Sequence, residues 1–81
     1  MKCYRIRNSD GLYSKGGTTP FWTKKGKTWS AKQHIKSHLT QYRNYRHREI
    51  PDDWIVEEIS FAPNIICEYK EYNAKDFHEN Q

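Results

Sequence analysis

Two histidines stand at a spacing that would let both bind one metal ion. His34 and His38 are four residues apart in a segment with helical periodicity, so both imidazoles would lie on one helix face. The further ligands would have to be Cys3 and Cys67, which are distant in the chain, whereas zinc-finger cysteines come in close pairs. We therefore expect a surface His34, a His38 at the border of the core, no metal and no other cofactor.

Other motifs that could support catalysis are incomplete. Gly26-Lys27-Thr28 matches the end of a phosphate-binding loop, but Phe21 stands where that motif needs its first glycine. Glu57 and Glu58 are neighbours in a predicted strand, so they should point to opposite faces and cannot share a proton. We find no Ser/His/Asp arrangement with a suitable local context, and we predict that the protein is not an enzyme.

Cations interleaved with aromatic rings give the first half of the chain its clearest binding chemistry. Rings exposed on a basic sheet can stack on unpaired bases while the cations contact phosphates. A chain poor in aliphatic residues must, however, bury most of its rings. The residues predicted to bind nucleic acid are Arg5, Arg7, Lys24, Lys25, Lys27, Lys32, Lys36, Arg43, Arg46, Trp22 and Tyr13.

The aromatic residues are divided between these two roles. We expect Trp29, Trp54 and Phe61 to form the core. We expect the more exposed rings to be those of Tyr13, Trp22 and Tyr45.

The second half of the chain offers a different kind of binding surface. An acidic hairpin can imitate a row of phosphates and occupy a basic groove on another protein, because complementary charge speeds association and selects partners. The residues predicted for this protein-binding surface are Asp52, Asp53, Glu57, Glu58, Glu68 and Glu71. The two halves of opposite charge could also join two copies of the chain into a homo-oligomer.

Charge is divided sharply along the 81 residues. Residues 1–49 carry 12 Lys and Arg against two acids, a net charge of +10, and residues 50–81 carry a net charge of −6. This asymmetry concerns partners rather than the fold. The hydrophobic content of 35% lies below the roughly 45–50% of typical globular chains, yet three Trp, six Tyr and three Phe can build a small core.

We expect a soluble, cytoplasmic protein with free thiols. The start of the chain, Met1-Lys2-Cys3-Tyr4-Arg5, contains no apolar run, and the longest apolar stretches have three residues, too few to span a membrane. Two cysteines do not make a disulfide framework, although one bridge between Cys3 and Cys67 is an open alternative.

A β-meander is predicted for the N-terminal third of the chain. Apolar residues alternate with arginines around Tyr4 and Ile6, and Asp10-Gly11 is a strong hairpin-turn signal because glycine accepts a positive φ. Lys24 to Lys27 should form a second turn. The expected strands cover residues 1–7, 12–15 and 21–23.

An amphipathic helix is predicted to follow Ser30. Ser30 and Gln33 fit the capping box, in which each side chain satisfies a free N–H at the start of the helix. Pro51 bounds the helix, which should end near Tyr45 to Arg48. Its apolar stripe would consist of Ala31, Ile35, Leu39 and Tyr42.

A β-hairpin with an acidic outer face should complete the fold. Residues 54–61 and 65–72 are β-prone, and Pro63-Asn64 would turn the chain between them. We predict one α+β domain over residues 1–73, a small antiparallel sheet made of the meander and the hairpin and packed against one amphipathic helix. Residues 74–81 should be a polar C-terminal tail, with room for one helical turn around Ala74 to Phe77.

Three segments within residues 4–40 resemble small, uncharacterised proteins of tailed bacteriophages. They are residues 12–17 (LYSKGG), 21–29 (FWTKKGKTW) and 35–39 (IKSHL), of which the glycines and tryptophans are the recognisable part. The resemblance implies a small accessory protein made in the cytoplasm of an infected bacterium, where such products often bind host enzymes or defence systems. It implies no catalytic or binding residues.

Together these observations predict a non-enzymatic, phage-type accessory protein that acts by binding. Its partner would be a host protein that handles nucleic acid, such as an anti-phage defence protein, which it would inhibit or modulate. The alternative is direct binding of RNA or DNA through the basic, aromatic N-terminal half.

Overall fold

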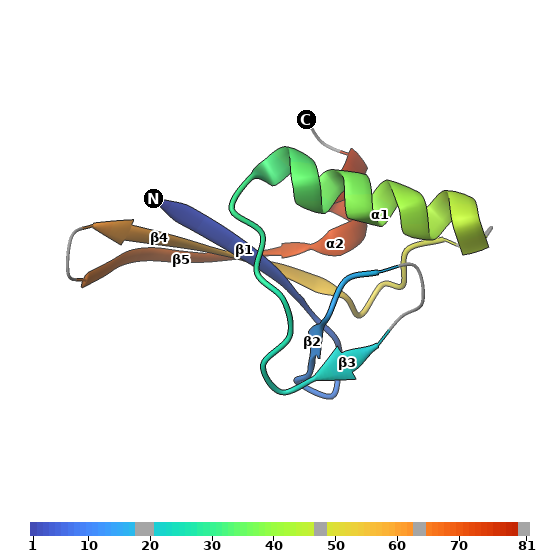
Figure 1. The fold of residues 1–81 in the computed structure, drawn as a ribbon, viewed down its shortest axis with the longest axis horizontal. Coiled ribbons are helices and arrows are strands. Elements are labelled where there is room, and N and C mark those ends of the chain that lie inside the picture. The colour runs from blue at the N-terminus through green and yellow to red at the C-terminus, as the bar shows by residue number, and fades with distance from the viewer. Residues whose placement is uncertain (18–20, 47–48, 63–64, 80–81) are drawn as a thin grey trace.

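A five-stranded antiparallel sheet with two helices forms the fold (Figure 1). The computed structural model describes residues 1–17, 21–46, 49–62 and 65–79, apart from the side chains at 45, 46, 62 and 65–67. The predicted α+β class is confirmed. The elements are β1 (Lys2–Arg7), β2 (Tyr13–Ser14), β3 (Trp22–Thr23), α1 (Lys32–Arg46), β4 (Ile55–Ala62), β5 (Ile65–Asn73) and α2 (Ala74–Glu79).

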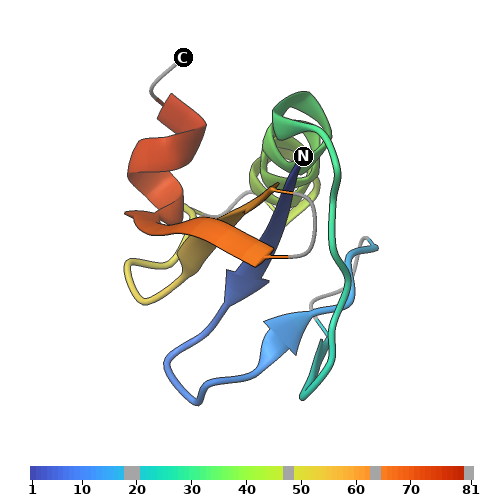
Figure 2. The same ribbon diagram turned by 90° about the vertical axis from the view of Figure 1, so that its left-hand side faces the viewer.

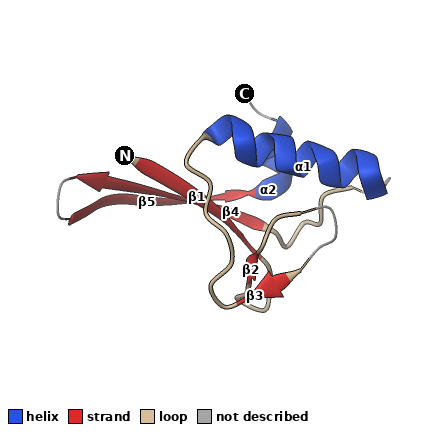
Figure 3. Cartoon of the chain, viewed as in Figure 1, coloured by secondary structure: helices blue, strands red, loops and turns tan. Residues whose placement is uncertain are grey.

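Strand β1 joins the two halves of the chain at the centre of the sheet. The strand order is β3-β2-β1-β4-β5, so the N-terminal strands and the C-terminal hairpin form one continuous sheet (Figure 3). β1 and β4 pair over six residues, from Lys2 opposite Ser60 to Arg7 opposite Ile55. After β3 the chain returns to β1, where Tyr4 and Trp29 exchange two backbone hydrogen bonds of 2.8 Å.

The core lies between one face of the sheet and the two helices, which both cover that face (Figure 2). Alternation along the strands sends Ile6 and Val56, which are paired partners, into this layer. Ile35 and Leu39 of α1 are fully buried against them. The buried core consists of Tyr4, Ile6, Trp29, Ile35, Leu39, Ile50, Trp54, Val56, Ala74 and Phe77.

Helix α1 begins slightly later than the capping-box pattern indicates. The carbonyl of Ala31 accepts hydrogen bonds from the N–H groups of His34 (3.1 Å) and Ile35 (3.4 Å), so Ala31 takes the N-cap position. The prediction of Ser30 as the cap is therefore wrong by one residue. Tyr42, at the far end of the apolar stripe, is half-buried against Trp54, with ring centroids 4.7 Å apart.

The C-terminal segment forms a second helix that packs on the core, where a polar tail with one helical turn around Ala74 to Phe77 was expected. Asn73 Oδ1 accepts hydrogen bonds from two backbone N–H groups in the first turn of α2, at 3.0 and 3.3 Å, and so caps this helix. Phe77 packs on Tyr4 and Tyr72, with ring centroids 6.1 and 5.5 Å away. Residues 74–79, expected outside the domain, thus supply two core residues, Ala74 and Phe77.

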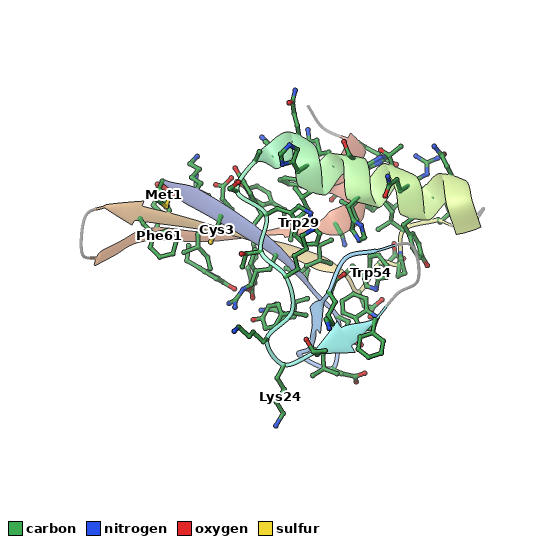
Figure 4. The ribbon with its side chains drawn as sticks, in the orientation of Figure 1. Met1, Cys3, Lys24, Trp29, Trp54 and Phe61 are labelled. Atoms are coloured by element: carbon green, nitrogen blue, oxygen red, sulfur yellow. The ribbon has the colours of Figure 1, made fainter. Side chains whose placement is uncertain are left out.

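The outer end of the β1, β4 and β5 sheet extends beyond both helices (Figure 1). Met1 and Phe61 lie side by side there, because the Phe61 N–H donates to the Met1 carbonyl at 2.7 Å (Figure 4). Their exposed fractions are 92% and 37%, so the prediction of Phe61 in the core is wrong. The proposed Pro63-Asn64 turn falls outside the described residues.

Gly26 holds the turn after β3 close to β2, and an alanine there is expected to be costly. Gly26 has φ +66°, and an added Cβ would overlap Tyr13 Cβ. We expect Gly26→Ala to lower the free energy of unfolding by about 2 kcal/mol, because left-handed strain and overlap add. Denaturant unfolding measures this loss. The matched control is Gly11→Ala, at φ +79° with open space around the Cβ, which should cost about 1 kcal/mol. Equal losses of stability in the two variants would show that the structure shifts to relieve the overlap between the added Cβ and Tyr13.

Candidate functional site

The open face of the sheet, opposite the helices, carries a cluster of ionised and phenolic side chains. The β1–β4 register places Arg5 directly across from Glu57. Glu57, whose side chain is only 1% exposed, accepts a hydrogen bond from Arg5 Nε to Oε1 at 2.8 Å. Arg7 Nη1 contacts its other oxygen, Oε2, at 2.6 Å. The Glu57 cluster, as we call it, consists of Arg5, Arg7, Tyr13, Glu57, Tyr69 and Glu71.

Two phenols complete the hydrogen bonding of the Glu57 cluster. Tyr13 and Tyr69 donate to Glu57 Oε2 at 3.2 and 2.6 Å. The Tyr69 oxygen also lies 2.9 Å from Glu71 Oε2, so one hydroxyl proton stands between two carboxylates. Arg7 Nη2 reaches the same Glu71 oxygen at 2.9 Å, and the guanidinium of Arg5 stacks over the Tyr13 ring at 4.1 Å.

These contacts shift the pKa values of Glu57 and Tyr69. Burial alone would raise the pKa of Glu57, but hydrogen bonds from Tyr69, Arg5 and Tyr13 outweigh it and hold that pKa below its usual value. The pKa of Tyr69 is raised, first by burial and then by its hydrogen bonds to Glu57 and Glu71. Glu57 is therefore an ionised acceptor and Tyr69 a neutral donor near neutral pH.

The Glu57 cluster brings together residues that the sequence analysis assigned to two opposite functions. Arg5, Arg7 and Tyr13 were expected to contact nucleic acid, yet their polar groups are engaged by Glu57 and Glu71 of the same chain. Arg5, Arg7, Glu57 and Glu71 are thus paired within one copy, and association of two copies through the remaining charges stays a prediction. The expectation of a solvent-facing Glu57 is wrong, because the register of β1 and β4 buries its carboxylate beneath two arginines.

Glu58 is also buried, but on the helix-covered face of the sheet. It lies opposite Tyr4 in the β1–β4 register and is 6% exposed. Its Oε2 accepts a hydrogen bond from Tyr72 OH at 3.4 Å and lies 3.9 Å from Lys2 Nζ. The expectation that Glu58 belongs to an acidic outer face is therefore wrong as well.

The other predicted acids do not form a continuous row. Asp52 and Asp53 are exposed just before β4, where Asp53 Oδ2 accepts a hydrogen bond from the Ser9 N–H at 3.3 Å. Glu68 is exposed towards the opposite end of the hairpin and lies 3.6 Å from Lys70 Nζ. Asp52 and Asp53 thus lie at one end of the hairpin and Glu68 lies towards the other.

The remaining predicted cations lie on α1 and at the turn after β3. Lys24 and Lys25 are exposed at that turn, from which Lys24 projects into solvent (Figure 4). Lys32 and Lys36 extend from α1 towards α2, their ammonium groups 5.6 and 5.5 Å from the centroid of the Phe77 ring. Arg43 is exposed on the same helix. The side chains of Arg46 and Tyr45 lie outside the described residues.

Trp22 was expected to present an exposed ring to nucleic acid, but it is half-buried. Its ring packs edge-on against Trp54, with centroids 5.1 Å apart. Phe21, which the sequence analysis did not select, is 59% exposed and lies 5.6 Å from Lys15 Nζ. Phe21 is thus the better exposed of the two neighbouring rings.

A groove separates α1 from the segments at Gly16–Gly17 and Lys27–Trp29. It has a volume of about 230 Å³, and one wall is formed by His34, Ser37, His38 and Gln41 of α1. The His38 ring stacks on Trp29 at 5.2 Å, and Lys27 Nζ lies 5.4 Å from the centroid of the Trp29 ring. Burial, followed by the charge of Lys27, lowers the pKa of His38. The groove was not predicted, because Lys27 and the two histidines lie in separate segments of the sequence.

The two histidines of α1 do not share a metal site with Cys3. His34 is exposed and His38 is half-buried, whereas Cys3 is a free thiol on the open face, opposite Ile59. No group of three metal-ligating side chains occurs within the described part of the chain. The side chain of Cys67 is not among those described, so the alternative of a bridge to Cys3 stays a prediction.

Comparisons with known proteins returned no match. The chain matches no family model, no curated protein and no solved structure at the significance required. In the residues described, neither helix is long and apolar enough to cross a membrane.

Proposed function

We propose that this protein acts by binding and that it contacts nucleic acid directly through cations of α1 and of the turn after β3. The observation that carries the proposal is that several exposed cations have no ion-pair partner among the described residues, whereas three of the acids are engaged inside the molecule. Lys24, Lys25, Lys32 and Arg43 lie beyond ion-pair distance of every acid within the described ranges, whereas Glu57, Glu58 and Glu71 are engaged inside the molecule. Exposed, uncompensated cations favour a polyanionic partner.

The proposed contact is made mainly with phosphates rather than with bases. Tyr13 and Trp22 are occupied by Arg5 and Trp54, which leaves Phe21 as an exposed ring near the cations. Phosphate contacts position a polymer without reading its sequence. We therefore expect modest sequence preference, strong salt dependence and, if Phe21 stacks on a base, some preference for single strands.

Charge reversal tests this proposal. We expect Lys24→Glu with Lys25→Glu to weaken binding of single-stranded DNA, duplex DNA or RNA about tenfold or more at moderate salt. The slope of log affinity against log salt should fall by about 0.7–0.9 for each phosphate that the variant no longer neutralises. Fluorescence anisotropy with labelled oligonucleotides measures both quantities.

The control for this experiment reverses an exposed acid. Glu68→Lys should leave nucleic-acid affinity almost unchanged, because Glu68 lies towards the outer end of the hairpin, away from α1. If the variant with Lys24→Glu and Lys25→Glu binds as tightly as the wild-type protein and with the same salt slope, the turn after β3 has no part in binding.

A second candidate function is binding of a host protein by a phage-type accessory protein in the bacterial cytoplasm. The observation that favours it is the apolar outer end of the sheet, where Met1 and Phe61 are exposed. The host protein that binds this apolar end would be one that handles nucleic acid, and binding would inhibit or modulate that host protein. Phe61→Ser separates the candidates, since it should abolish capture of a protein partner and leave nucleic-acid affinity unchanged.

A further inference from the structure

We propose that the groove between α1 and the Gly16–Gly17 segment is a binding site for a phosphate dianion. The phosphate groove, as we call it, is defined by Gly16, Gly17, Lys27, Trp29 and the helix residues His34, Ser37, His38 and Gln41. This inference deepens the proposed function and rests on it for one natural source of the ligand, the terminal phosphate of a nucleic-acid strand. Free phosphate would bind by the same chemistry.

Each polar side chain around the phosphate groove has at least one hydrogen-bond donor, and none of the lining residues is an acid. His34, Ser37, His38 and Gln41 share one face of α1 because they are three or four residues apart. Lys27 stands on the other side of the groove. An ammonium has donors only, and imidazoles, a hydroxyl and an amide can each donate to phosphate oxygens.

The Gly16 backbone holds the ammonium group of Lys27 in place. Gly16 has φ +80°, and a Cβ there would lie 3.1 Å from Lys27 Cδ and 3.8 Å from Lys27 Nζ. Because Gly16 has no side chain, the Lys27 stem can pack against it while the ammonium lies over Trp29. The Lys27 N–H donates to the Ser14 carbonyl at 2.8 Å, which fixes the start of the side chain. Such preorganisation lowers the entropy lost on binding.

His38 supplies the second recognition element. Its ring stacks on Trp29, and its pKa is lowered by burial and by the charge of Lys27. The charged or titratable residues that line the groove around it are Lys27 and His34. An anion placed between Lys27 and His38 would offset their repulsion and favour the protonated imidazole. Binding of a dianion should therefore take up a proton and tighten as the pH falls through the histidine range.

The volume of the phosphate groove suits a small group. Its volume of about 230 Å³ is below the roughly 300–1,000 Å³ of sites that enclose drug-sized ligands. A phosphate with part of a sugar fits this volume better than a complete nucleotide. A wider hollow of about 700 Å³ adjoins it over α1, shares His34, Ser37 and Gln41, and leaves room for the rest of a strand.

Titration with inorganic phosphate and with sulfate, followed by NMR of the full chain, tests the site. We expect saturable shifts of the His34 and His38 ring signals with both anions. Sulfate stays a dianion throughout, so its affinity should rise as the pH is lowered from about 7.5 to about 6. Lys27→Gln and His34→Gln should each weaken binding about tenfold. Lys70→Gln, which removes an exposed lysine of β5, should change nothing.

Oligonucleotides with and without a 5′-phosphate distinguish the two sources of the ligand. Preference for the phosphorylated strand, lost in Lys27→Gln, assigns the groove to a strand terminus. Saturable binding of inorganic phosphate without such a preference supports the groove as a site for free phosphate. If, in addition, no oligonucleotide binds, the proposed function fails while the groove stands.

Other outcomes overturn the inference. Anion-induced shifts that spread over exposed lysines without saturating, or unchanged affinity in Lys27→Gln and His34→Gln, would show that the groove is not a phosphate site. Nucleic-acid binding through Lys24 and Lys25 could still hold in that case. His34 is exposed, so its substitution tests the site even if Lys27→Gln disturbs folding.

Discussion

Glu57→Gln is expected to lower the free energy of unfolding by about 3 kcal/mol. The carboxylate of Glu57 is buried and contacts Arg5, Arg7, Tyr13 and Tyr69. An amide removes the negative charge and places an NH₂ donor among groups that are themselves donors. A domain of this size has about 4–12 kcal/mol of stability in total, so the loss is a large fraction of it.

Thermal and urea unfolding measure this effect. The expected loss corresponds to a decrease in Tm of roughly 12–24 °C for a domain of this length. The matched control is Glu68→Gln, because Glu68 is half-exposed and pairs only loosely with Lys70, at 3.6 Å. It should change stability by less than about 0.5 kcal/mol. Similar losses for the two variants would mean that the Glu57 cluster contributes no more than an exposed ion pair.

The carboxylate of Glu57 should also make the free energy of unfolding depend on pH in the acidic range. Folding lowers the pKa of Glu57, so its contribution is present above the ordinary value of 4.5 and is lost as the pH falls through the lower, folded value. Burial also lowers the pKa values of His38 and His78. Their contribution to the free energy of unfolding is therefore lost at higher pH than that of Glu57, as the pH falls below the ordinary value of 6.5. In Glu57→Gln the loss of stability below pH 4.5 should be shallower, and the loss near 6.5 unchanged.

Phe77→Ala should be at least as destabilising, by about 3–5 kcal/mol. Phe77 is 5% exposed and joins α2 to the sheet through Tyr4 and Tyr72. Its removal leaves a cavity beneath a helix of six residues, which has little stability of its own. Urea unfolding followed by tryptophan fluorescence measures the loss.

Phe61→Ala provides the control for this prediction, since it deletes the same side chain from the exposed outer end of the sheet. Its cost should be below about 1 kcal/mol. If Phe77→Ala costs no more than Phe61→Ala, α2 is not part of the cooperative core, and residues 74–79 behave as the tail that their polar composition indicates.

Local patterns were sufficient to predict most elements of the fold. Alternation around Tyr4 and Ile6 indicated β1, and the spacing of Ile35 and Leu39 indicated α1. These signals are local because a strand or a helix buries one face at a fixed period. For α2, only one helical turn around Ala74 to Phe77 within a polar tail was expected, because one buried phenylalanine among polar residues has no detectable period. Asn73, a good N-cap residue, was the available signal.

The candidate site depended on contacts between distant segments, which composition and spacing do not reveal. Alternation placed Arg5 and Arg7 on one face of β1, but only the β1–β4 register shows that Glu57 lies across from them. Arg5, Arg7 and Tyr13 were therefore assigned to one binding surface and Glu57 and Glu71 to another, although these five side chains form a single cluster. The phosphate groove was missed for the same reason, because Gly16, Lys27 and His38 come from separate segments that meet only in the folded chain.

The pairing of β1 with β4 also determines when the fold can form. Arg5 and Glu57 are separated by 52 positions, so the central ladder of the sheet closes a long loop. Such non-local topology slows folding relative to helical proteins of the same length. During synthesis, the strongly basic first half leaves the ribosome before the acidic strand that neutralises Arg5 and Arg7. The nascent chain is thus a polycation without its internal counter-charge until β4 emerges.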